Sequence, residues 1–206
     1  MHTFTAQDFQ SWDRFYRANF INSLSGYKPA FLVGTVNESG QPNLSIFSNI
    51  IHLGADPALI GMLNRPREAA PHTLSNIEKT GVFTLNMISR NMIDAAHQTS
   101  AKYAADISEF DTTGLTPCWR DGCNAPFVEE SPVHLHLEKL QVIPIEQNGT
   151  FFIIGALKSV HLNASMIESD GFLDLTKAEI ICTQGIDGYF LPEKIKRLPY
   201  AKPTKI

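Results

Sequence analysis

Residues 133–162 contain two largely apolar stretches, VHLHLEKLQVIPI at 133–145 and TFFIIGALKSVHL at 150–162, joined by EQNG at 146–149. Asn148-Gly149 predicts a type I′ turn, because that turn needs positive φ at both central positions. The two stretches are therefore expected to form the arms of an antiparallel β-hairpin. The apolar positions of the first arm change parity between Leu137 and Leu140, which a β-bulge near Glu138 would produce. Because bulges curve a sheet, this hairpin favours a barrel.

Further strands are expected earlier in the chain, and they bring the total to five or six. They cover residues 30–36, 43–50, 58–63 and 82–87. Helices are expected between and before them. Their ranges are 6–20, started by a capping box of Thr5 and Asp8, 72–80, ended by Gly81, and a helical or broken-helical stretch over 90–105.

The predicted helices do not alternate regularly with the strands, and this disfavours a doubly wound α/β fold. The fold class predicted here is mainly β, an antiparallel barrel of Greek-key type with peripheral helices, since closure removes unpaired sheet edges. We expect one domain over residues 1–206, with the barrel core at about 23–165 and a C-terminal extension at 166–206. The Gly- and Pro-containing stretch 111–126 is interpreted as a long loop that closes over a site or reaches a neighbouring subunit.

Charge and composition exclude several classes of partner. The 206 residues carry a formal net charge of -4, so no broad positive field attracts nucleic acid or an anionic membrane. Prolines interleave the basic residues near the C-terminus, which indicates a solvated tail. The N-terminus lacks a signal-peptide pattern, and no apolar run approaches the roughly 18 residues that span a bilayer. With three cysteines and free thiols expected at Cys118 and Cys123, we expect a cytoplasmic protein.

The histidines give weak signals. His134 and His136 lie two residues apart and share a face of a strand, but no third metal ligand follows at short spacing. We therefore expect no metal site and interpret both as the outward face of a hairpin arm. His52 and His97 are single histidines in apolar surroundings, where a structural role is the simpler interpretation.

A stronger signal is a set of polar and cationic residues between positions 43 and 73. Short polar side chains occupy one strand, at Asn43, Ser45, Ser48 and Asn49, and they are followed by Asn64-Arg65 and by Thr73 at a helix start. An arginine, hydroxyl groups and the free N–H groups of a helix N-terminus are the components of an anion site. A polar turn followed by an ordinary helix cap fits the same residues, and the chemistry alone leaves both interpretations open.

Several motifs occur in an order that resembles a known family. They are PNLSIFSN at 42–49, DPALI at 56–60, HTLSNI at 72–77 and GVFTLN at 81–86, with Tyr103, Ser108-Glu109-Phe110, Gly114-Leu115 and 155–161 further on. The chain resembles the flavin reductase-like family of FMN-binding split β-barrels over roughly residues 23–165, with a weaker similarity at 188–190. It departs from the family pattern at Pro57-Ala58, where many members have two prolines, and at His72, where an acidic residue is common.

The resemblance implies that FMN lies across the barrel mouth near the interface of a homodimer. Ser45, Ile46, Phe47, Ser48 and Asn49 would line the isoalloxazine and ribityl chain. Asn64, Arg65 and Thr73 would hold the phosphate, and His72 would suit an anion. His97 falls in the stretch that the family places near its active site, where it would stack on the nicotinamide or the flavin.

The function expected from this resemblance is that of an FMN-dependent oxidoreductase that transfers hydride from NADH or NADPH to flavin. The reduced flavin would pass its electrons to an acceptor that the sequence does not identify. The alternatives are a flavin electron carrier, an FMN oxidase on the same barrel that acts on a substrate such as pyridoxamine phosphate, or a non-catalytic FMN-binding protein.

Overall fold

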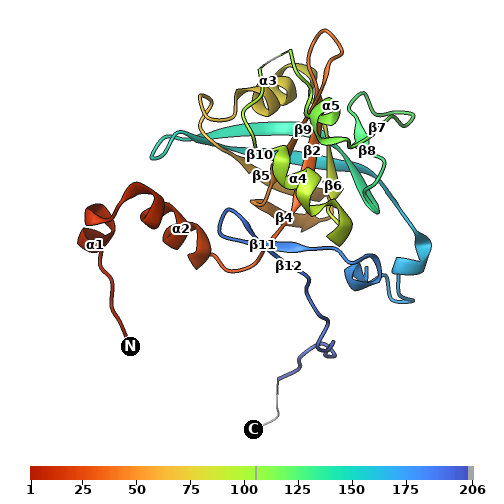
Figure 1. The fold of residues 1–206 in the computed structure, drawn as a ribbon. Coiled ribbons are helices and arrows are strands. Elements are labelled where there is room, and N and C mark those ends of the chain that lie inside the picture. The colour runs from red at the N-terminus through yellow and green to blue at the C-terminus, as the bar shows by residue number, and fades with distance from the viewer. Residues whose placement is uncertain (105, 204–206) are drawn as a thin grey trace.

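A computed structural model describes residues 1–104 and 106–203, and its centre is a seven-stranded antiparallel sheet (Figure 1). The strand order is β3-β2-β6-β9-β10-β5-β4. The strands are β2 (Phe31–Val36), β3 (Pro42–Phe47), β4 (Ile50–Ala55), β5 (Ala58–Asn64), β6 (Val82–Met87), β9 (Val133–Ile145) and β10 (Thr150–Leu162). The predicted mainly β, antiparallel fold is confirmed. The strand β4 was not expected from the sequence.

The sheet curls because its two edge strands are consecutive in the chain. Only Ser48 and Asn49 lie between β3 and β4, which stand at opposite ends of the strand order. Two residues span less than about 11 Å even when fully extended, so the two edges must approach each other. The amide of Leu63 donates to the carbonyl oxygen of Asn49 at 3.0 Å and fixes this crossing against β5. The result is a barrel with a split between β3 and β4.

The long hairpin has the predicted arms but a different turn. Thr150 pairs with Ile145, so the loop contains four residues, and Gly149 has a φ of 70° whereas Asn148 has no positive φ. The type I′ assignment is therefore wrong. The amide of Gly149 donates to the Ile145 carbonyl at 2.9 Å, which closes the wider turn. The predicted bulge is present, since the register skips Leu140, and a second irregularity skips Lys158.

Two of the apolar clusters lie on the two sides of β2. All six residues of β2 are buried. Phe31 and Val33 belong to the larger cluster, with Phe83, Leu137 and Ile153 among its members. Leu32 belongs to a second cluster whose other members are Ala30, Leu44, Ile88, Met92, Ala96, Phe110, Leu115, Val128 and Ile181. A strand covered on both faces shows a nearly continuous apolar sequence, as residues 30–36 do.

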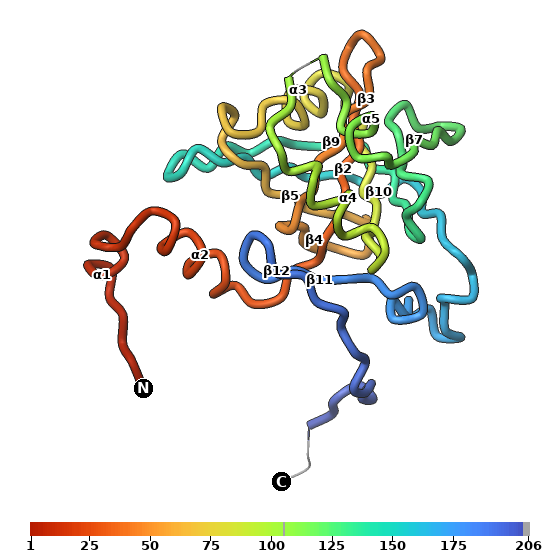
Figure 2. The backbone as a smooth tube through the Cα atoms, in the orientation of Figure 1, coloured from red at the N-terminus to blue at the C-terminus, as the bar shows by residue number. Residues whose placement is uncertain are grey.

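The prediction of one continuous N-terminal helix over 6–20 is wrong. The structure has α1 (Ala6–Ser11) and α2 (Arg14–Leu24), because the Asp13 carboxylate accepts the amide protons of Phe15 and Tyr16 and starts a new helix. The capping box of Thr5 and Asp8 is present. Figure 2 traces these helices as an arm that projects away from the barrel, and neither helix contains a buried residue.

The remaining helices surround the barrel. They are α3 (Pro71–Thr80), η1 (Arg90–Met92), α4 (Ile93–Gln98), α5 (Glu109–Thr113), η2 (Ala164–Met166) and η3 (Leu175–Ala178). Gly81 ends α3 in the left-handed conformation with a φ of 75°, as predicted. Among the described residues, no helix is long and apolar enough to cross a membrane.

Two small sheets complete the fold. One has the order β1-β11-β12, built from Lys28–Pro29, Cys182–Gln184 and Gly188–Phe190. The other pairs β7 (Pro117–Cys118), inside the stretch 111–126 predicted as a long loop, with β8 (Phe127–Val128), which follows that stretch. This stretch packs on the barrel, where the carbonyl oxygen of Pro126 accepts a hydrogen bond of 2.6 Å from Thr84.

Candidate functional site

A cavity of about 490 Å³ lies beside the split in the barrel. This volume is within the usual range of small-molecule sites, about 300–1,000 Å³. All ten candidate site residues line it, namely Ser45, Ile46, Phe47, Ser48, Asn49, Asn64, Arg65, His72, Thr73 and His97. None of the described lining residues comes from 111–126, so the structure does not support a role for that loop in closing this pocket.

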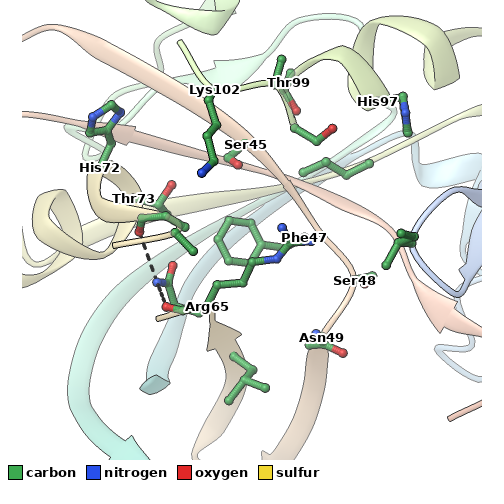
Figure 3. A pocket seen from close by; sticks show the side chains of 18 of the residues that line it. Ser45, Phe47, Ser48, Asn49, Arg65, His72, Thr73, His97, Thr99 and Lys102 are labelled. Atoms are coloured by element: carbon green, nitrogen blue, oxygen red, sulfur yellow. Dashed lines mark hydrogen bonds between the residues drawn. The ribbon is translucent and has the colours of Figure 1, made fainter. Parts of the chain in front are cut away.

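The alternation of faces expected over 43–50 stops short of the end of that range. The strand β3 stops at Phe47, and Ser48 and Asn49 form the crossing to β4. Side chains on both faces of this stretch can therefore reach one cavity. In Figure 3 the labelled residues Ser45, Phe47, Ser48 and Asn49 follow this stretch around the pocket.

The start of α3 forms the anion-binding side of the pocket. Ala70 occupies the N-cap position without a side-chain hydrogen bond, and Pro71 follows as the first helical residue. The amides of His72 and Thr73 therefore stand at a helix start that no side chain caps, where the helix dipole also favours negative charge. Asn43 donates to the hydroxyl of the buried Thr73 at 3.3 Å and orients it.

Arg65 and Asn64 have different roles, although both line the pocket. The side chain of Arg65 is exposed, and Figure 3 shows it extending toward Phe47. Asn64 is fully buried, and its side chain donates to the carbonyl of Arg65 at 2.8 Å. Asn64 thus shapes the turn that carries Arg65. Two residues on, Arg67 forms a bidentate pair with Glu78 at 2.8 Å outside the pocket lining.

Other pocket residues escaped the sequence analysis. In Figure 3, Lys102 points from the segment after α4 toward Ser45 and Thr73. The three-stranded sheet β1-β11-β12 contributes Lys28, Thr183 and Tyr189. A lone lysine or threonine has no pattern of its own that marks it, even where, like Lys102, it stands next to a recognised residue. The similarity at 188–190 was the one signal that could have included the C-terminal strands.

Glu109 is a buried carboxylate in the wall of the pocket. It is 6% exposed, and its Oε2 atom accepts the amide proton of Leu44 at 2.9 Å. Leu44 lies in the edge strand β3, so this carboxylate satisfies an amide that has no strand beside it. Burial raises the pKa of Glu109, and hydrogen bonds from the backbone oppose that rise.

His97 meets the C-terminal hairpin across the pocket. Its Nδ1 atom lies 2.7 Å from the hydroxyl oxygen of Tyr189, and the two rings pack edge to face with centroids 5.7 Å apart. Burial, with a smaller contribution from Asp187, raises the pKa of Tyr189. The expectation of a histidine in apolar surroundings is therefore wrong for His97, which is exposed and lies in a polar setting.

The other histidines also differ from their predicted settings. His134 and His136 are 4% and 5% exposed, because the segment 117–128 covers the face that was expected to be outward. Arg120 lies 3.2 Å from Nδ1 of His134, and burial lowers the pKa of both histidines. His52 is exposed on β4, where an apolar setting was expected.

Comparisons with solved structures agree with this geometry. A candidate flavin reductase with split barrel domain from Shewanella frigidimarina NCIMB 400 is 42% identical, with a TM-score of 0.93 over 98% of this chain and 100% of that one. Nitrilotriacetate monooxygenase component B from Bacillus cereus is 18% identical, with a TM-score of 0.85 over 96% of this chain and 98% of that one, which supports the fold alone.

Comparisons of sequence lead to the same family. A protein of Aquifex aeolicus (strain VF5) is 25% identical over 127 residues, which cover 61% of this chain and 65%, just under two thirds, of that protein's length. Residues 26–175 match the family described as "Flavin reductase like domain". This match includes the polar strand, Arg65, the start of α3 and His97, and it ends before β11 and β12. The chain therefore belongs to the flavin reductase-like domain family and has its split-barrel fold.

Proposed function

We propose that this protein is an FMN-dependent oxidoreductase that accepts hydride from NADH or NADPH and passes electrons on to a second acceptor. The observation that carries the proposal is the convergence of three elements on one cavity. They are the polar end of β3, the Arg65 guanidinium and the uncapped start of α3. A phosphorylated ligand with a large, partly polar ring system fits this combination of groups.

The residues of the pocket suit FMN. The start of α3 offers backbone amides for a phosphate, and Arg65 forms no ion pair within residues 1–104 and 106–203. The pocket wall also contains buried polar atoms without a protein partner, Oδ1 of Asn64 and Oγ1 of Thr183. Buried polar atoms normally have a hydrogen-bond partner, so orphaned atoms in a pocket wall are consistent with a bound polar ligand.

In the proposed reaction the chain binds, orients and shields its ligands. FMN, when bound, supplies the redox chemistry, since its ring system accepts hydride from the nicotinamide. Ser45, Ser48 and Asn49 would hydrogen-bond the polar parts of the flavin, while Ile46 and Phe47 would contact its apolar surface. Arg65, His72 and Thr73 would hold the phosphate through charge and backbone amides. The main contribution of the protein to the rate would be to hold the flavin and nicotinamide rings in contact.

His97 would contact the nicotinamide or the flavin from the side opposite His72 and Thr73. In Figure 3, His97 lies on one side of the pocket, and His72 and Thr73 lie on the other. The bond to Tyr189 holds the imidazole in one orientation, which favours a positioned contact with the reacting rings over a freely rotating side chain.

The protein would act as a homodimer with FMN near the interface. The arm formed by α1 and α2 supports this proposal, because it projects from the barrel and leaves Phe15 74% and Leu24 63% exposed. Large exposed apolar side chains are typical of surfaces that bind another protein. We expect gel filtration to give a dimer mass, and a monomer mass would contradict the interface site.

The oxidoreductase proposal is tested by anaerobic mixing of FMN-loaded protein with NADH and, separately, with NADPH. We expect bleaching of the flavin absorbance with at least one donor, followed by steady donor oxidation when an acceptor is added. A flavin that stays oxidised with both donors would exclude the reductase and leave FMN binding alone. Protein that retains no FMN on purification and binds none when titrated would contradict both.

A further inference from the structure

The small sheet β1-β11-β12 contributes a second polar group of residues to the pocket. Lys28 of β1 and Thr183 of β11 are paired neighbours in this sheet, and both line the cavity. Tyr189 of β12 binds His97, so this sheet stands on the His97 side of the pocket, away from His72 and Thr73. Its strands β11 and β12 lie beyond residue 175, where the family match ends.

The pocket contains more cationic side chains than the proposed flavin phosphate site uses. Among the described residues that line it, three carry a full positive charge, namely Lys28, Arg65 and Lys102. Two acidic side chains, Glu68 and Glu109, also line it, and the Glu109 carboxylate accepts the amide proton of Leu44 in the pocket wall. A phosphomonoester carries about −1.5 to −2 charges at pH 7, and Arg65, Lys102 and the start of α3 already match it.

Lys28 lacks an acidic partner in the part of the chain that the structure describes. Its ammonium group lies 3.4 Å from the carbonyl oxygen of Gly185, a weak hydrogen bond from half-buried surroundings. Burial, and then the positive charge of Arg65, lower the pKa of Lys28. A half-buried cation without an acidic partner is stabilised when an anion binds beside it.

Thr183 adds an unsatisfied hydroxyl at the same place. The residue is 6% exposed, and its Oγ1 atom is buried without a hydrogen-bond partner. A buried hydroxyl without a partner costs free energy that a ligand oxygen would recover.

From this juxtaposition we propose that Lys28 and Thr183 form a subsite for a phosphoryl group of the nicotinamide donor, separate from the site of the flavin phosphate. The inference rests on the proposed function and adds a binding role for Lys28 of β1 and for Thr183 of β11, a strand beyond the family match. Two phosphoryl groups have the required chemistry, the 2′-phosphate that only NADPH carries and the diphosphate that NADH and NADPH share.

The experiment measures equilibrium binding, so that it does not depend on hydride transfer. NADP⁺ and NAD⁺ are titrated calorimetrically into the FMN-loaded protein and into the variants Lys28→Met and Thr183→Val. Lys196→Met, in the exposed tail, is the matched control for loss of one positive charge. FMN affinity, measured separately for each variant, reports whether the flavin site is intact and the variant folded.

Loss of a charge-assisted hydrogen bond is expected to weaken dinucleotide binding about tenfold or more in Lys28→Met, with a smaller loss in Thr183→Val. Weakening of NADP⁺ alone assigns the subsite to the 2′-phosphate, and equal weakening of both assigns it to the diphosphate. Unchanged binding of both dinucleotides, or a loss of FMN affinity as large as theirs, overturns the proposal. Reduction of the flavin by NADH or NADPH tests the proposed function separately.

Discussion

The Nδ1 atom of His97 and the hydroxyl oxygen of Tyr189 lie 2.7 Å apart, although 92 residues separate them in the chain. This bond joins α4 to the C-terminal hairpin across the pocket. The raised pKa of Tyr189 keeps its phenol protonated at neutral pH, so the phenol has a proton to donate to Nδ1. If the phenol donates to Nδ1, the imidazole carries its proton on Nε2, whereas a proton on Nδ1 would be donated to the phenol oxygen.

Tyr189→Phe removes this hydroxyl and leaves the ring. We expect the KM for the nicotinamide donor to rise about two- to tenfold, the effect of losing one neutral hydrogen bond, with FMN affinity unchanged. Steady-state kinetics with each donor and an FMN titration check this expectation. Tyr200→Phe is the control, because Tyr200 is 92% exposed in the tail. A variant with the kinetic constants of the native protein would show that the bond does not position His97.

Arg65→Ala tests the phosphate end of the proposed flavin site. A desolvated phosphate that loses a charge-assisted partner should bind more weakly by about 1.5 to 3 kcal/mol, which is roughly ten- to 150-fold in Kd. FMN titration monitored by fluorescence quenching measures the change. Arg67→Ala is a matched control, since Arg67 pairs with Glu78 and does not line the pocket. Equal FMN affinity in both variants would remove Arg65 from the site.

Local patterns in the sequence predicted much of the barrel. The strand 82–87, both hairpin arms and the helix ended by Gly81 follow from periodicity and turn residues, which act over short distances. The polar strand and the helix start that meet at the pocket belong to the same contiguous region, so the predicted residues converge there.

The errors have identifiable physical causes. The His134 ring was assigned outward because alternation on a strand cannot reveal that residues 117–128 fold over it. The turn after Ile145 uses four residues, since the amides of Asn148 and Gly149 both donate to its carbonyl. Lys28, Thr183 and Tyr189 reach the pocket only because β1 pairs with β11, a long-range contact without a local signal.

Gly34→Ala tests how the segment 117–128 is attached to the barrel. A Cβ atom at Gly34 would lie 2.1 Å from the carbonyl oxygen of Pro126 and 2.5 Å from Oγ1 of Thr84. We expect a loss of about 1 to 3 kcal/mol in unfolding free energy from this overlap, or about 2–4 °C in Tm for each kcal/mol. Thermal unfolding followed by circular dichroism measures it. Gly54→Ala is the control, because the nearest neighbour of its added Cβ atom would be 3.4 Å away. Equal changes of Tm in the two variants would contradict the close approach of Pro126 to Gly34.

Glu109→Gln makes a prediction about pH, because it keeps an acceptor for the Leu44 amide and removes the ionisable group. Burial raises the pKa of Glu109 in the folded state, so the native protein binds more protons than the unfolded chain between the ordinary and the raised value. Stability must therefore fall as pH rises through that window. The variant lacks this loss, so we expect it to match the native protein in acid and to exceed it in unfolding free energy above the window. Urea unfolding across a pH series checks the difference, with the exposed Glu146→Gln as control. If the native protein gained stability relative to Glu109→Gln as pH rises, the Glu109 carboxylate would be stabilised in the pocket wall, and the raised pKa would be wrong.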